Sequence, residues 1–382
     1  MTSWPTSSLF DVQETPTSGR GVFATQLIPT GTQLLACSDL VYGLVFREYR
    51  REVCNWCFRY EQGDILPVRE NRAALVWCTE ECRDAWMEEH GKVGVDAFAA
   101  VEDLSRKQAK MVVKAEEEAG LLPTGSATAT AIQPTPEDIE TAWIAAETTA
   151  DLIRSARYSN KPSKPERKAI AQALSSKIDS IVINHAISSL IASTSHPPAW
   201  QTVQDLYASP QPYISTEQLQ THLTTYFQLL ALLPLKLLPM CTRSTLITAI
   251  DRDAHNSFGI RSLDDDASEM FGYGTWPSAS YWNHSCSPNI LKRRVGRTWT
   301  FTTSRDVMEG EELCITYLGG EEEELDVKAR RDMLWKAWKF VCGCTRCKVE
   351  SQRIEGDGVA GAKADGESEK ADGEDVAMTE VE

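Results

Sequence analysis

Hydrophobic and polar positions divide the chain into two strand-like ends and a helical middle. Short runs of strand-forming residues, separated by glycines and turns, fill residues 1–50 and return over residues 251–320. Residues 93–250 show helical patterns instead, interrupted near 121–137 by a stretch rich in Pro, Thr, Ala and Gly that is typical of a linker. The alternation predicts an α+β fold.

The end of the chain has a different texture. Residues 324–340 show a helical pattern, and a cysteine cluster follows them at once. From Ser351 onward large hydrophobic residues are few, whereas glycine and acidic residues are frequent. We therefore expect residues 351–382 to form a disordered acidic tail.

Composition and charge narrow the class of protein. The chain has 382 residues, of which 42% are hydrophobic and 25% charged, so it can form about two to three domains with buried cores. Its formal net charge of −16 argues against nucleic-acid binding, because that function relies on Lys and Arg to neutralise phosphates.

We also expect an intracellular protein, in the nucleus or the cytoplasm, without a membrane partner. The start of the sequence lacks the pattern of a secretory leader. The most hydrophobic stretch, residues 229–240, is too short to span a bilayer and contains two prolines and a lysine. In a reducing compartment, eleven cysteines indicate metal binding rather than disulfides.

Two cysteine pairs within residues 51–92 predict a small zinc finger. Cys54 and Cys57 are separated by two residues, and Cys78 and Cys82 by three, so each pair can point two thiolates at one ion. Four sulfur ligands leave no open coordination position, which predicts a structural zinc. The residues between the pairs can form a loop or a small hairpin, and we interpret His90 as a surface histidine at a helix end.

A second cluster holds three thiolates, from Cys342, Cys344 and Cys347. Zinc requires a fourth ligand. Spacing alone leaves several candidates open, which are a histidine or one of the cysteines Cys37, Cys241, Cys286 and Cys314.

Two polar motifs of the C-terminal strand region are candidates for a functional site. The run from Asn283 to Asn289 reads Asn-His-Ser-Cys-Ser-Pro-Asn and has hydrophobic flanks, so its amides and imidazole need partners from a ligand or from the protein. The segment 312–317 can form a strand that ends in Tyr317. Each motif could equally be structural, as a satisfied polar turn and as a core tyrosine.

The motifs in their order along the chain resemble a known family. The order is Gly-Arg-Gly-Val-Phe-Ala from Gly19, the two cysteine pairs, the run from Asn283, Glu-Leu-Cys-Ile-Thr-Tyr up to Tyr317, and Cys-x-Cys-x2-Cys. This order resembles the SET-domain lysine methyltransferases of the SMYD type, and their fungal SET6-like members look especially similar. The resemblance covers nearly the whole chain except the linker and the tail.

The resemblance implies the fold in more detail. A SET domain of short strands, residues 1–50 and 251–320, is split by a MYND-like finger at 51–92 and by the helical insert at 93–250. A zinc-binding post-SET segment follows at 321–350. A full MYND finger has eight ligands, whereas this chain has one quartet, so we expect one zinc in the finger and one in the post-SET segment.

The resemblance also assigns roles to individual residues. Tyr317 matches the catalytic tyrosine, and Cys286 matches the fourth ligand of the second zinc. The residues that would bind S-adenosylmethionine are Arg20, Asn256, Phe258, Asn283, His284 and Phe340. Those that would line the channel for the substrate lysine are Tyr317, Trp338 and Phe340.

The implied function is transfer of methyl groups from S-adenosylmethionine to lysine side chains of a protein substrate, histone or not, by a monomeric enzyme. The alternative is a weakly active or inactive zinc scaffold that recruits protein partners, which the single cysteine quartet and the bulky Trp338 suggest. A nucleic-acid-binding zinc protein is the least supported hypothesis because of the negative charge.

Overall fold

The computed structural model describes residues 4–15, 18–61, 63–119, 132–263, 269–320 and 323–364. It divides into two units, the first formed by Met1–Asn283 with Ile290–Leu313 and the second by His284–Asn289 with Cys314–Glu382. Most of the expected linker and the tail from residue 365 lie outside the described residues.

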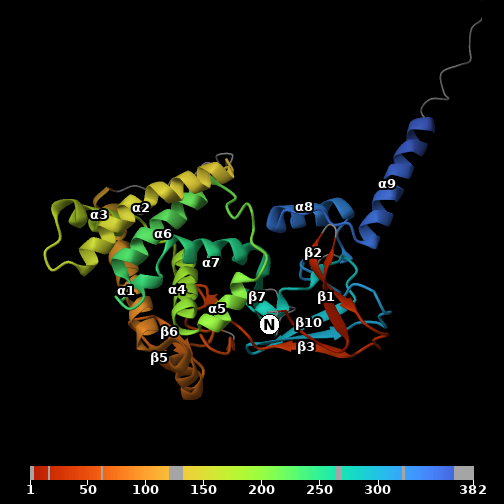
Figure 1. Ribbon diagram of the computed structural model, residues 1–382, viewed down its shortest axis with the longest axis horizontal. Helices are drawn as coiled ribbons and strands as arrows, with labels where there is room; N and C mark the ends of the chain where they lie inside the picture. Colours follow the sequence, from red (N-terminus) through yellow and green to blue (C-terminus); the bar gives the residue numbers. More distant parts are fainter. Residues whose placement is uncertain are drawn as a thin grey trace, which may run out of the picture. The chain divides into compact units, whose positions relative to one another are not determined.

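The strands of the first unit come from both ends of the chain. In order they are β1 (Phe10–Thr15), β2 (Gly19–Ala24), β3 (Gln33–Cys37), β4 (Tyr42–Val45), β5 (Val68–Glu70), β6 (Leu75–Trp77), β7 (Ser257–Arg261), β8 (Met270–Thr275), β10 (Ile290–Val295) and β11 (Thr298–Thr303). The N-terminal β3 joins the sheet β10-β11-β3, where Cys37 lies opposite Trp299, and β4 joins the sheet β4-β8-β7, where Tyr42 lies opposite Thr275 (Figure 1). Residues 1–50 and 251–320 therefore share their sheets although about 200 residues separate them along the chain.

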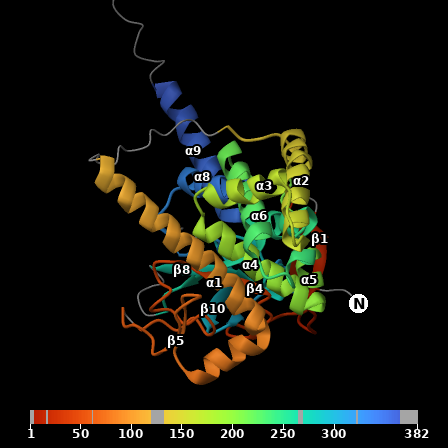
Figure 2. The same ribbon diagram turned by 90° about the vertical axis from the view of Figure 1, so that its left-hand side faces the viewer.

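Helices fill the interval between β6 and β7. They are α1 (Glu80–Ala119), α2 (Pro136–Tyr158), α3 (Lys164–Ser175), α4 (Ser180–Ser195), α5 (Pro197–Gln204), α6 (Thr216–Leu232) and α7 (Arg243–Asn256), with the short turns η1 (Leu238–Met240) and, after β8, η2 (Pro277–Ala279). Figure 2 shows α2 to α6 gathered beside the long α1.

Local sequence accounts for several helix boundaries. α2 begins at Pro136, where Thr135 and Asp138 form a reciprocal capping box. Gly91, with φ 61°, divides α1 into the helix that ends the finger and the helix that enters the insert.

The helical insert has its own hydrophobic core. Trp143, Leu190 and Tyr226 are 0% exposed and pack within one large cluster contributed by α1, α2, α4 and α6. One helix of this insert, α4, also packs against the strand β4. Ser188 on α4 donates a hydrogen bond to the Gly43 carbonyl at 2.9 Å.

The second unit consists of the short strands β9 (Asn283–His284, from its second residue) and β12 (Cys314–Ile315) and the helices α8 (Val327–Trp338) and α9 (Thr345–Ala364). Its hydrophobic cluster is small and is built on Leu318, Val327 and Leu334 together with the buried cysteines. We expected disorder from Ser351, but the structure differs and continues α9 to Ala364. The first turns of α9 are anchored by ion pairs of Glu350 with Arg330 and Arg346, and the helix continues beyond them.

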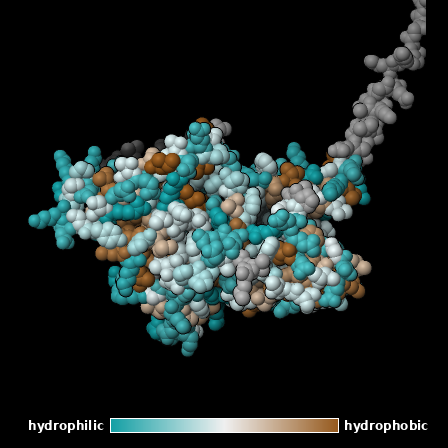
Figure 3. Space-filling view, in the orientation of Figure 1, coloured by the Kyte–Doolittle hydropathy of each residue, from teal (hydrophilic) through white to brown (hydrophobic). Residues whose placement is uncertain are grey.

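Within the described residues, every helix is too short or too polar to cross a membrane. Figure 3 shows that polar residues predominate on the visible face, with hydrophobic residues in small separate groups. Single exposed hydrophobic side chains of this kind are normal on protein surfaces.

Candidate functional site

The four finger cysteines converge on one point in the first unit. The ligand atoms of Cys54, Cys57, Cys78 and Cys82 all lie within 4.8 Å of one another, with 3.5 Å between the sulfurs of Cys57 and Cys78. Tetrahedral zinc with bonds of about 2.3 Å would hold its sulfurs about 3.8 Å apart, so the quartet fits this ion. The thiols share their protons, since hydrogen bonding between Cys54 and Cys57 lowers the pKa of Cys54 and raises that of Cys57.

The C-terminal cluster is completed by Cys286. Its sulfur lies 3.8 Å from that of Cys342 and 3.5 Å from that of Cys347, and Cys344 belongs to the same group. The other candidates for a fourth ligand lie outside this group, which settles the alternative that spacing left open. All eleven cysteines are free thiols, so both quartets could hold zinc.

A buried arginine adjoins the C-terminal cluster. Arg330 on α8 is 0% exposed and donates to the Cys347 sulfur at 3.5 Å and to Glu350 at 2.6 Å. Four thiolates around one Zn²⁺ carry a net charge of −2, and burying that charge is costly unless it is paired. The guanidinium therefore supplies the compensating charge that this cluster requires.

The ring of Tyr317 is surrounded by two aromatic side chains and an imidazole of the second unit. The ring centroid of Tyr317 lies 5.2 Å from Trp338, 6.3 Å from Phe340 and 5.3 Å from His284. Phe340 follows α8 immediately after Lys339, whose left-handed conformation (φ 59°) ends the helix. Four residues that the sequence singled out are thus brought together beside the cysteine cluster of their own unit.

His284 joins two features of that unit through its ring. The backbone N–H of Tyr317 donates to His284 Nδ1 at 3.0 Å, and Nε2 lies 3.2 Å from the Cys286 sulfur. Nearby, the backbone N–H of Ser285 donates to the Ile315 carbonyl at 2.9 Å. The polar turn and the strand before Tyr317 are therefore tied together within the second unit.

In the first unit, Arg20 and Asn283 meet at β2. Asn283 Nδ2 donates to the Arg20 carbonyl at 3.1 Å and to Glu312 Oε1 at 2.8 Å. Gly21 makes this pairing possible, because a Cβ at that position would lie 2.6 Å from Glu312 Oε1 and 2.9 Å from Asn283 Nδ2. The amide nitrogen of Asn283 is thus committed to the protein.

Asn256 lies close to the same segments but is held differently. It is 4% exposed, and its Nδ2 donates to the carbonyls of Tyr207 at 2.9 Å and Arg252 at 2.7 Å. Arg20 donates to the Asp205 carbonyl at 2.9 Å, and its guanidinium lies 5.0 Å from the Tyr281 ring. Asn256 therefore fixes the chain around residues 205–207, where Arg20 is also anchored.

Phe258 is placed apart from these polar contacts. Its ring packs at 5.3 Å from Trp299 and 6.4 Å from both Trp276, which follows β8, and Phe301. Phe258 is half-buried, and its assignment to cofactor binding stays a prediction.

The comparisons with known proteins decide the family. The sequence model of the SET domain matches residues 19–318, which is most of the chain and runs from Gly19 past Tyr317. The chain belongs to the SET-domain family. The resemblance inferred from the motifs is therefore confirmed.

Individual relatives agree with this assignment. The chain is 27% identical over 378 residues to the potential protein lysine methyltransferase SET6 of Saccharomyces cerevisiae, covering 91% of this chain and 97% of the relative. It is 30% identical over 135 residues to the histone-lysine N-methyltransferase ASHR2 of Arabidopsis thaliana, covering 33% and 32% of the two chains. The human histone-lysine N-methyltransferase SMYD3 is 34% identical over 97 residues, covering 25% and 21%.

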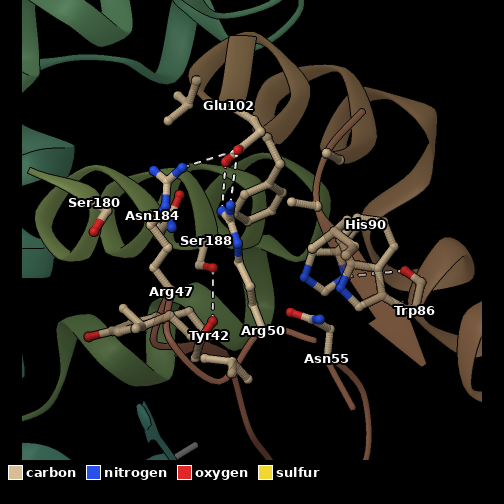
Figure 4. A pocket seen from close by; sticks show the side chains of 18 of the residues that line it. Tyr42, Arg47, Arg50, Asn55, Trp86, His90, Glu102, Ser180, Asn184 and Ser188 are labelled. Atoms are coloured by element: carbon tan, nitrogen blue, oxygen red, sulfur yellow. Dashed lines mark hydrogen bonds and ion pairs between the residues drawn. The ribbon is translucent and has the colours of Figure 1, made fainter. Parts of the chain in front are cut away.

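A separate cavity of about 60 Å³ lies where the finger and α1 meet β4 and α4 (Figure 4). Its charged groups are paired internally, since Arg50 donates to Glu102 at 2.6 and 2.9 Å. The expectation of a surface histidine here is wrong, because His90 is 15% exposed and stacks on Trp86 at 4.3 Å. Burial lowers the pKa of His90 to about 3, so the ring is neutral.

The sequence assigned no role to two residues that make specific contacts, although Glu312 begins the motif that ends in Tyr317. Glu312 holds the Asn283 amide, and Arg330 pairs with the C-terminal cluster. Their partners are 29 and 17 residues away along the chain, and an acid or an arginine in such a position carries no spacing signal of its own.

We predict that Arg330→Met lowers the free energy of unfolding of the zinc-loaded protein by about 3 kcal/mol, because it leaves buried thiolates and Glu350 without their cation. The matched control is Lys328→Met, an exposed lysine on the same helix, which should change it by less than about 0.5 kcal/mol. Urea unfolding followed by tryptophan fluorescence measures both. Equal stabilities of the two variants would contradict the assigned role.

Proposed function

We propose that this SET-domain protein is an S-adenosylmethionine-dependent protein-lysine N-methyltransferase. The observation that carries the proposal is the half-buried phenol of Tyr317, framed by Trp338, Phe340 and His284 at the end of the matched SET region. The yeast, plant and human relatives, which are described as lysine methyltransferases, support the same activity.

The residues would act mainly by positioning. When bound, S-adenosylmethionine supplies an electrophilic methyl group that an uncharged amine can accept. The Tyr317 hydroxyl orients the lysine amine, and alignment of this kind can account for a large part of a rate enhancement. The rings of Trp338 and Phe340 exclude water from the lysine stem, which disfavours the charged ammonium and so favours the reactive amine.

We infer that Arg20, whose guanidinium can pair with a carboxylate, and Asn283 of the first unit bind S-adenosylmethionine. In the second unit, we infer the same role for His284 and Phe340. Asn256 supports this site through the segment 205–207 rather than through its own amide nitrogen. The substrate is a protein with an exposed lysine, histones being one candidate class. We propose that the enzyme acts as a monomer within the nucleus or the cytoplasm.

Each cysteine quartet is proposed to hold one zinc ion. Metal analysis of the purified protein should then give two zinc ions per chain. Cys342→Ser should reduce the content to one, because three ligands at the C-terminal site hold zinc far more weakly. Cys241→Ser is the matched control, since that thiol is buried in the helical core outside both quartets, and it should retain two ions. A single zinc in the parent protein would contradict the proposal.

We predict that Tyr317→Phe lowers methyl transfer about a hundredfold, because the amine loses the hydroxyl that aligns it. The measurement is transfer of labelled methyl groups from S-adenosylmethionine to proteins of a broad lysate and to histones. Tyr158→Phe, an exposed tyrosine at the end of α2, should transfer at the parent rate. If the zinc-loaded parent binds the cofactor but methylates no protein, the proposed activity is wrong.

A further inference from the structure

We propose that the imidazole of His284 is a positioning residue that couples metal binding at the C-terminal cluster to the backbone of Tyr317. The inference rests on the proposed function only in taking Tyr317 as the tyrosine that orients the substrate. The resemblance assigns His284 to cofactor binding, whereas the contacts of its ring lie with the protein.

The first contact fixes the tautomer of the ring. The backbone N–H of Tyr317 lies 3.0 Å from His284 Nδ1. A backbone N–H can only donate, so Nδ1 must present its lone pair. The proton of the neutral imidazole is therefore on Nε2.

The second contact directs that proton at a metal ligand. Nε2 lies 3.2 Å from the sulfur of Cys286, which itself lies 3.5 Å from Cys347 and 3.8 Å from Cys342. When zinc occupies the quartet, the four sulfurs are thiolates, and a thiolate is a far better acceptor than a thiol. The Nε2–H donor then stabilises the metal-bound sulfur, as partners of metal ligands commonly do.

The two contacts form one chain from the metal to the tyrosine. Zinc would hold the Cys286 sulfur in place, and without it that sulfur no longer fixes the position of the imidazole. A ring that is no longer held at Nε2 also holds the Tyr317 N–H less firmly at Nδ1. His284 thus links the metal site to the tyrosine backbone, over residues that all belong to the second unit.

Two substitutions separate the two contacts. The amide of an Asn side chain reaches about as far as Nδ1, and that of Gln reaches about as far as Nε2. His284→Asn should therefore retain the acceptor for Tyr317 but lose the donor to Cys286. His284→Gln should retain the donor and lose the acceptor.

The first measurement is release of zinc to a chromophoric chelator, together with hydrogen exchange at the Tyr317 amide in the zinc-loaded full chain. We expect His284→Asn to release one of its zinc ions about tenfold faster, the low end for such a partner. We expect His284→Gln to exchange the Tyr317 amide about tenfold faster, as for the loss of one hydrogen bond. His196→Asn, which removes an imidazole of the first unit, should match the parent in both.

The second measurement tests the coupling itself with cysteine variants. Cys342→Ser, which weakens only the C-terminal quartet, should raise exchange at Tyr317, whereas Cys82→Ser in the finger should not. In the double variant Cys342→Ser/His284→Gln, the two effects should not add, since both act through the same contact.

Unchanged exchange at Tyr317 in Cys342→Ser would overturn the proposal, and so would additive effects in the double variant. A rise at Tyr317 in Cys342→Ser that is equalled along α8 would report loosening of the whole second unit rather than of this contact, and it would overturn the proposal as well. Neither readout requires methyl transfer, so an inactive protein that shows the coupling would refute the proposed activity and leave this inference standing.

Discussion

The second unit depends on four cysteine sulfurs meeting at one point. Its hydrophobic cluster, built on Leu318, Val327 and Leu334, is small, and small units seldom fold on such a core without a metal or a covalent link. Cys286 comes from the polar turn and the other three cysteines from the segment after α8, so one ion would join segments about 60 residues apart. The aromatic residues around Tyr317 lie on those segments, so their arrangement follows from that closure.

The first unit depends on a different constraint, which is the pairing of distant strands. Two strand regions at opposite ends of the sequence must pair across a long insert, and closing so large a loop costs conformational entropy. The insert offsets this entropy loss by burying its own core around Trp143 and Leu190. Its helix α4 also packs against β4, which connects the insert to the strands. Polar contacts complete the unit, since Gly21 leaves room for the Asn283–Glu312 pair.

Local features of the sequence predicted what local physics determines. The cysteine spacing gave the finger quartet, and the hairpin of β5 and β6 lies between its two pairs as one of the expected forms. Local spacing does not reveal which distant segment folds back onto the C-terminal cysteines, so spacing alone could not choose Cys286. The resemblance named it, and the geometry agrees.

The differences from expectation have physical causes as well. His90 ends the finger helix, a position that suggested exposure, but the turn at Gly91 follows it and the ring stacks on Trp86. Composition predicted disorder from Ser351, whereas α9 continues from a start that is anchored by Cys347 and Glu350. The roles of Glu312 and Arg330 depend on tertiary partners, which a single sequence does not reveal.

Titration calorimetry of S-adenosylmethionine into the zinc-loaded protein tests the cofactor site directly. We predict saturable binding with one site per chain, which is lost in an Asn283→Ala variant that retains its zinc and unfolds at a similar urea concentration. Absence of binding by the well-folded parent, or equal affinity of the variant, would contradict the assignment of this SET domain as a cofactor-dependent methyltransferase.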